Sequence, residues 1–160
     1  MDRFFNYTLT TLITLVALME LVQVISRYIF KIPIMGLEEL LVYPAIWLYF
    51  IGSANASRED TQIKANVLDV FLKSPRSILK VRVVADVLSL LVALWLAYWA
   101  WLYFLYALRV WKDSPTLYVP MFYAEAFVFL GIAAMAIYGA IYLVKNVKSL
   151  LTPTQKQQGA

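Results

Sequence analysis

The sequence predicts an all-α, polytopic membrane protein with four transmembrane helices. Of its 160 residues, 62% are hydrophobic and only 15% are charged, whereas soluble domains carry about 25% charged residues. Charges are absent from residues 40–56, 87–108 and 126–144, and residues 8–26 hold a single one, Glu20. A helix needs about 20 apolar residues to cross the hydrocarbon core of a bilayer. Each window reaches that length when its ends are slightly extended.

The breaks between these windows set the expected order of elements. Pro33 and Gly36 interrupt the chain after the first helix, and Ser74 and Pro75 suit the start of the third as N-cap and first helical residue. The first window is too long for a cleavable signal peptide, whose apolar part has about 7–15 residues. We expect one domain of residues 1–151 with transmembrane helices at about 4–28, 37–56, 75–110 and 122–144, and a disordered tail at 152–160.

A short amphipathic helix is expected at about residues 62–73, between the second and third transmembrane helices. Its apolar residues recur at helical spacing: Ile63, Val67, Val70 and Phe71. Lys64 and Lys73 lie on other faces, as in helices that bind the headgroup layer of a membrane. A loop helix that packs against the transmembrane helices fits the same spacing.

The distribution of Lys and Arg predicts the orientation of the chain. One side of the membrane would hold ten of them: Arg3, Arg58, Lys64, Lys73, Arg76, Lys80, Arg82, Lys145, Lys148 and Lys156. The other side would hold four: Arg27, Lys31, Arg109 and Lys112. Positive charge accumulates on the cytoplasmic side. We therefore expect a multi-pass protein of the bacterial inner membrane with both termini in the cytoplasm and with loops 29–37 and 111–121 outside.

The composition argues against an enzyme. The chain has no cysteine and no histidine, which excludes thiolate nucleophiles and the usual zinc, haem and iron–sulfur sites. It offers no nucleophile–base pair and no glycine-rich phosphate loop, and its loop cations are better explained by membrane orientation than by nucleic-acid binding. The few intramembrane polar groups are too sparse to line a path for a hydrophilic solute. We expect a non-catalytic, accessory role without cofactor or metal.

Glu20 is the most unusual residue of the predicted membrane segments. An acidic residue in the middle of a membrane helix costs about 2.5–3.5 kcal/mol on insertion scales. Glu20, Gln23 and Arg27 are spaced i, i+3, i+7 and share one helix face. Three roles remain open for Glu20: a proton- or cation-coupling site, a structural contact within the chain, and a contact with another subunit.

The third predicted helix is rich in aromatic residues between Trp95 and Tyr106. An aromatic belt at the membrane interface explains such residues. Trp95 and Trp99 lie deep for a belt, so a packing surface for a partner or for ordered lipids is the alternative.

A succession of short motifs resembles the small integral membrane (DctQ-type) subunit of tripartite ATP-independent periplasmic (TRAP) transporters. The motifs cover most of residues 20–135 and are Ser26-Arg27-Tyr28-Ile29-Phe30, Pro33, Glu38-Glu39-Leu40, Trp47, Phe50-Ile51-Gly52, Arg58-Glu59, Ile63, Ser114-Pro115, Pro120 and Gly131. The chain departs from the family at Gly36, where the family often has tryptophan. It also reads Gln62-Ile63-Lys64-Ala65-Asn66 where the family often has a His-Ile-x-Val-Asp run.

The resemblance implies a sodium-coupled symporter for organic acids of the sialic acid or C4-dicarboxylate class. In that family a large elevator-type subunit holds substrate and sodium, a periplasmic substrate-binding protein delivers the substrate, and the small subunit is a scaffold. Seven residues are expected to contact the large subunit or to hold such contacts in place: Glu20, Gln23, Arg27, Glu38, Glu39, Trp47 and Arg58. Lys31 and Lys112 are candidate contacts with the binding protein. Lipid-interface candidates are Lys64, Lys73, Phe71, Trp95 and Trp99.

A self-sufficient exporter is the competing hypothesis. Small multidrug-resistance proteins are proton-coupled four-helix exporters with an essential glutamate in the first helix, and Glu20 invites that comparison. The greater length of this chain, its long cytoplasmic loop and its long third helix argue against it.

Overall fold

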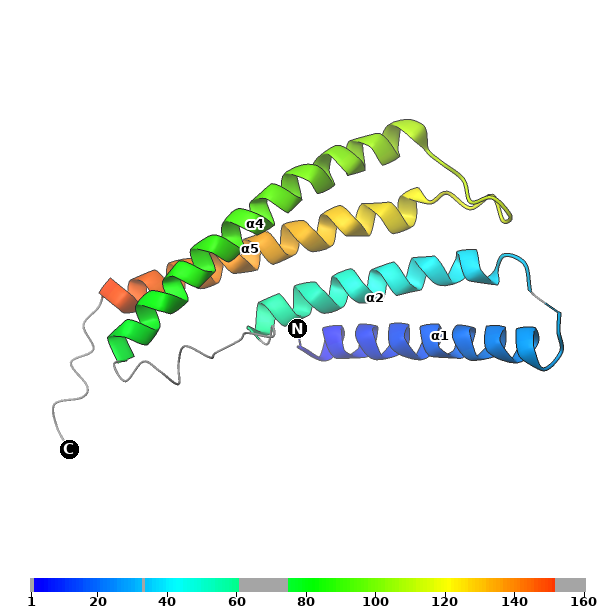
Figure 1. Cartoon of the computed structure of the whole chain (residues 1–160), viewed down its shortest axis with the longest axis horizontal. Coiled ribbons are helices and arrows are strands. Elements are labelled where there is room, and N and C mark those ends of the chain that lie inside the picture. The colour runs from blue at the N-terminus through cyan, green and yellow to red at the C-terminus, as the bar shows by residue number, and fades with distance from the viewer. Residues whose placement is uncertain (1, 33, 61–74, 152–160) are drawn as a thin grey trace.

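The computed structural model describes residues 2–32, 34–60 and 75–151 and consists of four long helices without a strand in these ranges (Figure 1). The helices are α1 (Asp2–Tyr28), α2 (Leu37–Glu59), α4 (Pro75–Val110) and α5 (Phe122–Leu151). All four are long and apolar enough to cross a membrane. The surface helix expected at 62–73 and the tail at 152–160 lie outside the described residues.

Two helices extend beyond the ends expected from the sequence. α2 continues past residue 56 to Glu59, and α5 continues past residue 144 to Leu151. The extension of α5 contains Lys145 and Lys148, and lysine is a good helix former. The end of an apolar window therefore marks where a helix reaches polar surroundings and not where its backbone stops being helical.

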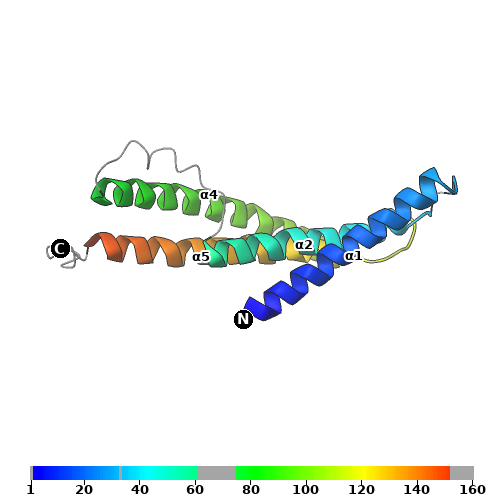
Figure 2. The same ribbon diagram turned by 90° about the horizontal axis from the view of Figure 1, so that it is seen from below.

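The helices lie side by side in an open, twisted row in the order α1, α2, α5, α4 (Figures 1 and 2). α1 packs on α2, α2 on α5, and α5 on α4. One end of the row, here called the loop end, carries the connections 29–36 and 111–121. The other, the terminal end, is staggered: the start of α1 and the end of α2 lie part-way along α4 and α5, whose own ends extend further (Figure 1). In this row the described helices enclose no common core.

The buried apolar residues of this row are few and mostly small. They are Tyr43, Pro44, Ala100, Ala107, Ala124 and Ala136. Large apolar side chains are instead exposed, among them Leu18 of α1 and Leu91 of α4. Lipid tails are as apolar as leucine, so helices in a bilayer gain little from hiding such side chains and associate through close packing of small residues. This burial pattern is the one expected for a chain surrounded by lipid or by membrane partners.

Gly131 marks a close approach between α2 and α5. A Cβ atom built on Gly131 would lie 2.6 Å from both Cβ and Cδ1 of Phe50. Nearby, the rings of Trp47 and Phe127 pack with their centroids 5.3 Å apart. Only glycine allows α5 to lie this close to α2 at this position.

We predict that Gly131→Ala destabilises the chain by about 1–3 kcal/mol, the usual cost of overpacking. The new methyl group would meet the Cβ of Phe50, which cannot move without its backbone. Unfolding in mixed micelles, followed by fluorescence of the five tryptophans, measures the effect. Gly139→Ala is the matched control, because its Cβ would have Leu90 Cδ1 as nearest neighbour at 3.9 Å. Equal stability of the two variants would contradict this view of the α2–α5 contact.

Candidate functional site

The carboxylate of Glu39 holds the loop between α4 and α5. It accepts hydrogen bonds from the Ser114 hydroxyl at 2.6 Å, from the Thr116 amide at 3.0 and 3.1 Å, and from the Leu117 amide at 3.1 Å. Glu39 lies in the first turn of α2, where the helix dipole favours an acid. One side chain of α2 thus fixes the backbone of a loop more than 70 residues away in sequence.

Two further side chains continue this attachment along the same face of α2. The Tyr43 hydroxyl donates to the Val119 carbonyl at 3.1 Å, and the Trp47 indole donates to the Tyr123 carbonyl at 3.0 Å. Glu39, Tyr43 and Trp47 are spaced i, i+4, i+8, so they lie one above another on the helix. We call these three residues the α2 clamp. They join the α1–α2 hairpin to the α4–α5 hairpin.

Gly36 makes room for the clamped loop. Its φ of 93° is left-handed, and a Cβ atom there would lie 2.8 Å from Leu117 Cγ. Both observations exclude a larger residue without rearrangement. The glycine at position 36 therefore has a local structural reason.

The helix face of α1 that carries Glu20, Gln23 and Arg27 divides into two parts. The Gln23 amide donates to Glu38 Oε1 at 2.6 Å and links α1 to α2. Glu20 is exposed, and no hydrogen bond or ion pair of its side chain is recorded among the described residues. Arg27 is also exposed, and its guanidinium lies 5.9 Å from the centroid of the Tyr28 ring. Although the three residues share one helix face, their interactions are separate: Gln23 bonds α2, and Arg27 lies beside Tyr28.

Arg58 connects three helices at the terminal end. Its guanidinium bonds Asn55 Oδ1 at 3.1 Å and Glu59 Oε1 at 2.8 Å, and it lies 4.8 Å from the centroid of the Phe5 ring of α1. The Tyr142 hydroxyl of α5 donates to the Arg58 carbonyl at 2.6 Å. This cluster and the α2 clamp together hold α2 at both ends.

Several of these contacts were not foreseen from the sequence. Ser114 was part of the Ser114-Pro115 motif of the family resemblance but had no predicted partner, and Tyr43 and Tyr142 were not singled out. Tyr43 stands one helical turn after Glu39, which is the one signal that would have suggested it. Asp86 accepts a hydrogen bond from Asn146 of α5 at 2.5 Å, a pairing that no sequence spacing indicates.

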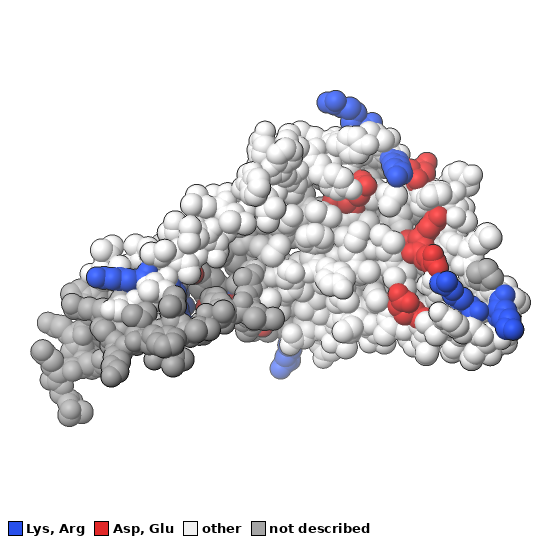
Figure 3. Space-filling view, viewed as in Figure 1, with Lys and Arg blue, Asp and Glu red and all other residues white. Residues whose placement is uncertain are grey.

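The remaining candidates are exposed or undescribed. Lys31 and Lys112 are exposed at the loop end, where acidic and basic side chains gather (Figure 3). Trp95 and Trp99 of α4 are 64% and 56% exposed, and the Trp99 ring packs edge-on against its neighbour Tyr98. Lys64, Phe71 and Lys73 lie outside the described residues. Among the described residues, no group of three or more acids, histidines or cysteines could hold a metal ion.

The four apolar helices define a multi-pass membrane protein. A family model described as "Tripartite ATP-independent periplasmic transporters, DctQ component" matches residues 15–149. The chain belongs to this family and is thus a small membrane component of a TRAP transporter. The match confirms the resemblance seen in the sequence. Comparison with curated proteins gave no match.

We predict that Glu39→Gln loosens the 111–121 loop. The substitution keeps the shape of the side chain but replaces charge-assisted hydrogen bonds, which are roughly twice as strong as neutral ones, and puts an amide group in place of one acceptor oxygen. Faster hydrogen exchange at the Thr116 and Leu117 amides measures the change. Glu38→Gln is the matched control, because Glu38 bonds Gln23 of α1 and not the loop. Exchange rates that stay the same in Glu39→Gln would show that the clamp does not depend on its charge.

Proposed function

We propose that this chain is the non-catalytic scaffold subunit of a sodium-coupled TRAP importer for organic acids of the sialic acid or C4-dicarboxylate class. In this role it holds a large elevator-type subunit in place while that subunit carries substrate. The observation that supports the proposal best is the open row of helices, in which each helix packs mainly on its neighbours in the row.

A row one helix thick suits a support better than a conduit. A solute path needs polar groups that converge from several helices, and the polar contacts of the described residues lie mainly toward the two ends of the row. Between those ends the row offers broad apolar surfaces, with Leu91, Trp95 and Trp99 of α4 exposed on one helix. Such surfaces suit a membrane partner on one side and lipid on another.

Glu20 supports the same role. It is exposed near the middle of α1, and α1 packs only on α2 among the strong helix contacts. An acid facing lipid at that depth is costly, and the cost falls when a partner supplies a hydrogen-bond donor or a cation. We infer that the Glu20 face of α1 contacts the large subunit, which would also hold the sodium sites.

The distribution of Lys and Arg supports the membrane orientation that we propose for the chain. With ten cations on one side and four on the other, both termini would lie in the cytoplasm of a bacterium and the loop end would face the periplasm. Lys31 and Lys112 would then be accessible to a periplasmic substrate-binding protein, and the row would cross the inner membrane.

Reconstitution tests the proposal directly. Tagged chain co-expressed with a large TRAP subunit is expected to retain it through detergent purification. Liposomes that contain both subunits, with binding protein and a sodium gradient, are expected to accumulate the organic acid, while liposomes with this chain alone stay inert. Transport by the chain alone, coupled to protons through Glu20, would replace the scaffold with the exporter hypothesis.

We predict that Glu20→Gln retains most transport by the assembled system, because glutamine keeps the size and hydrogen-bonding capacity of the side chain. Glu20→Lys reverses the charge and is expected to reduce the amount of large subunit that co-purifies. Both quantities are measured on the same preparations, after equal membrane insertion of the variants has been verified. Intact assembly with abolished transport in Glu20→Gln would instead assign Glu20 to ion coupling.

A further inference from the structure

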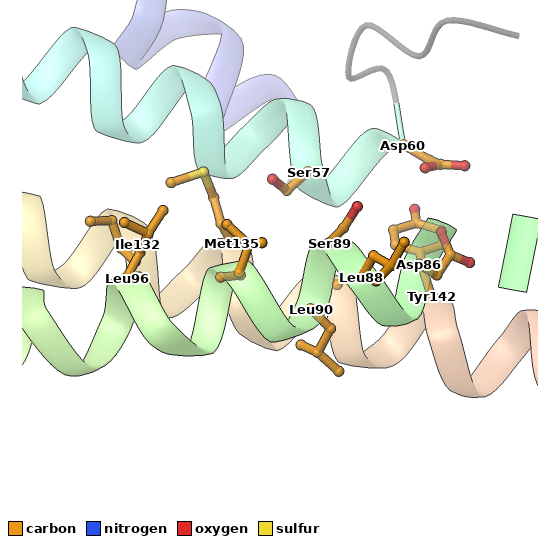
Figure 4. A pocket seen from close by; sticks show the side chains of 13 residues that line it. Ser57, Asp60, Asp86, Leu88, Ser89, Leu90, Leu96, Ile132, Met135 and Tyr142 are labelled. Atoms are coloured by element: carbon orange, nitrogen blue, oxygen red, sulfur yellow. The ribbon is translucent and has the colours of Figure 1, made fainter. Parts of the chain in front are cut away.

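The two ends of the row differ in the apolar surface that they offer. Toward the terminal end, Leu96, Ile132 and Met135 are among the residues that line a pocket of about 520 Å³ beside the end of α2 (Figure 4). At the loop end, apolar side chains are instead exposed where the chain turns from α1 into α2 (Figure 1). Five of them form what we call the apolar tip: Ile29, Phe30, Ile32, Ile34 and Met35.

The apolar tip is exposed on more than one side. Its side chains range from 46% exposed at Ile34 to 81% at Met35. Sequence neighbours such as Ile29 and Phe30 are both exposed, at 69% and 65%, and adjacent side chains point in different directions. A single flat protein surface would cover one side of such a segment, whereas lipid can surround it.

The backbone of the apolar tip is held in place although its side chains are exposed. The Ile32 amide donates to the Ser26 carbonyl at 3.1 Å, and the Ser26 hydroxyl donates to the Ile32 carbonyl at 2.5 Å. The Ile29 and Phe30 amides donate to the Ile25 carbonyl at 2.9 and 3.3 Å. Ser26 itself is buried. The tip therefore presents its apolar side chains at a fixed position beside the last turn of α1.

The charges of α2 indicate where the bilayer begins and ends. Residues 40–57 carry no charge, and the stretch from Glu39 to Arg58 is about 28 Å long at 1.5 Å per residue. This length is close to the roughly 30 Å of hydrocarbon in a bilayer. The first turn of α2, which holds Glu39, thus lies at the hydrocarbon boundary of the loop end.

Hydrogen bonds between α1 and α2 carry this level over to the apolar tip. Gln23 bonds Glu38 in the first turn of α2. Ser26 lies three residues further along α1, a rise of about 4–5 Å, and Ile32 is bonded to Ser26. The headgroup layer is about 5–8 Å thick on each side of the hydrocarbon. The apolar tip therefore lies within the headgroup layer and not in the water beyond it.

The polar neighbours of the apolar tip suit the same surroundings. Tyr28 is exposed, and the Arg27 guanidinium lies 5.9 Å from the centroid of its ring. Aromatic and cationic side chains are typical of a membrane interface. Lys31 is the one charged residue of the connection 29–36, and a lysine can keep its ammonium among phosphates while its stem lies along apolar groups. There it would also stay within reach of a binding protein.

We propose that the apolar tip inserts into the lipid leaflet at the loop end and anchors the α1–α2 hairpin there. Its side chains lie at the boundary between headgroups and acyl chains, where apolar surface leaves water, and Lys31 contacts lipid phosphates. Because α1 packs mainly on α2, the anchor gives this hairpin an attachment besides the α2 clamp. The inference concerns lipid contact and goes beyond the proposed role as a scaffold.

Spin labels in liposomes test the proposal on the full chain. The chain has no cysteine, so Met35→Cys can be labelled at one place. Collisions of the nitroxide with oxygen, which concentrates in hydrocarbon, are compared with collisions with a water-soluble nickel chelate. The two controls are Leu91→Cys, at an exposed apolar position within α4, and Asp113→Cys, at an exposed charged position of the other loop.

The oxygen-to-nickel ratio at position 35 is expected to exceed that at position 113 several-fold and to approach that at position 91. Equal ratios at positions 35 and 113 overturn the proposal. The ratio at position 35 is also expected to persist after co-reconstitution with a large TRAP subunit and after addition of the binding protein. Loss of access for both reagents would show that a protein covers the tip, and would overturn the proposal as well.

A charge placed in the apolar tip tests whether apolar insertion holds it in the lipid. In a chain labelled through Phe30→Cys, Met35→Asp is expected to raise nickel accessibility several-fold, because a carboxylate is costly in hydrocarbon. Met35→Leu keeps the apolar character and is the matched control, with accessibility unchanged. Circular dichroism verifies that both variants retain their helices. Equal nickel accessibility in the two variants would contradict the anchor.

Discussion

The seam between α2 and α5 joins two helical hairpins that otherwise do not share a core. At one end of it the Glu39 carboxylate binds the backbone and Ser114 side chain of the opposite hairpin's loop. At the other end Tyr142 bonds the Arg58 carbonyl, and between them Gly131 brings α5 against Phe50. The outer helices α1 and α4 pack on α2 and α5 respectively, so this seam is their main connection. The position of each helix in the row therefore depends on a small number of polar bonds and one glycine.

Polar bonds can have this importance because the surroundings are apolar. In water, a row of helices with so many exposed large apolar side chains would collapse to bury them. In hydrocarbon that driving force between helices is missing, and close contact between small residues together with hydrogen bonds decides which helices associate. Two observations fit this rule. The buried alanines at positions 100, 107, 124 and 136 are small residues at helix contacts. The Trp47 indole donates a hydrogen bond to a backbone carbonyl of the neighbouring hairpin.

The sequence predicted four long apolar helices, which the structure shows, because hydrocarbon excludes charge and that exclusion is visible in composition alone. It did not predict the open row, since helices that are apolar on all sides carry no periodic signal of which side packs on which neighbour. Glu38 and Glu39 illustrate the limit within the site. They are adjacent and chemically identical, yet one bonds α1 and the other bonds the 111–121 loop. Family resemblance could indicate that both matter, but only the direction of each side chain separates their partners.

The order of contacts along the row has a consequence for biosynthesis. α1 and α2 are neighbours in the chain and can pair as soon as both have left the ribosome, as can α4 and α5 later. The α2 clamp has no such early partner, because Ser114, Leu117 and Tyr123 are made only after α4 is complete. The α1–α2 hairpin is therefore synthesised before any partner of the α2 clamp exists. Until α5 is made, the Glu39 carboxylate, which is an acceptor, and the Trp47 indole N–H, which is a donor, face lipid headgroups or the insertion machinery.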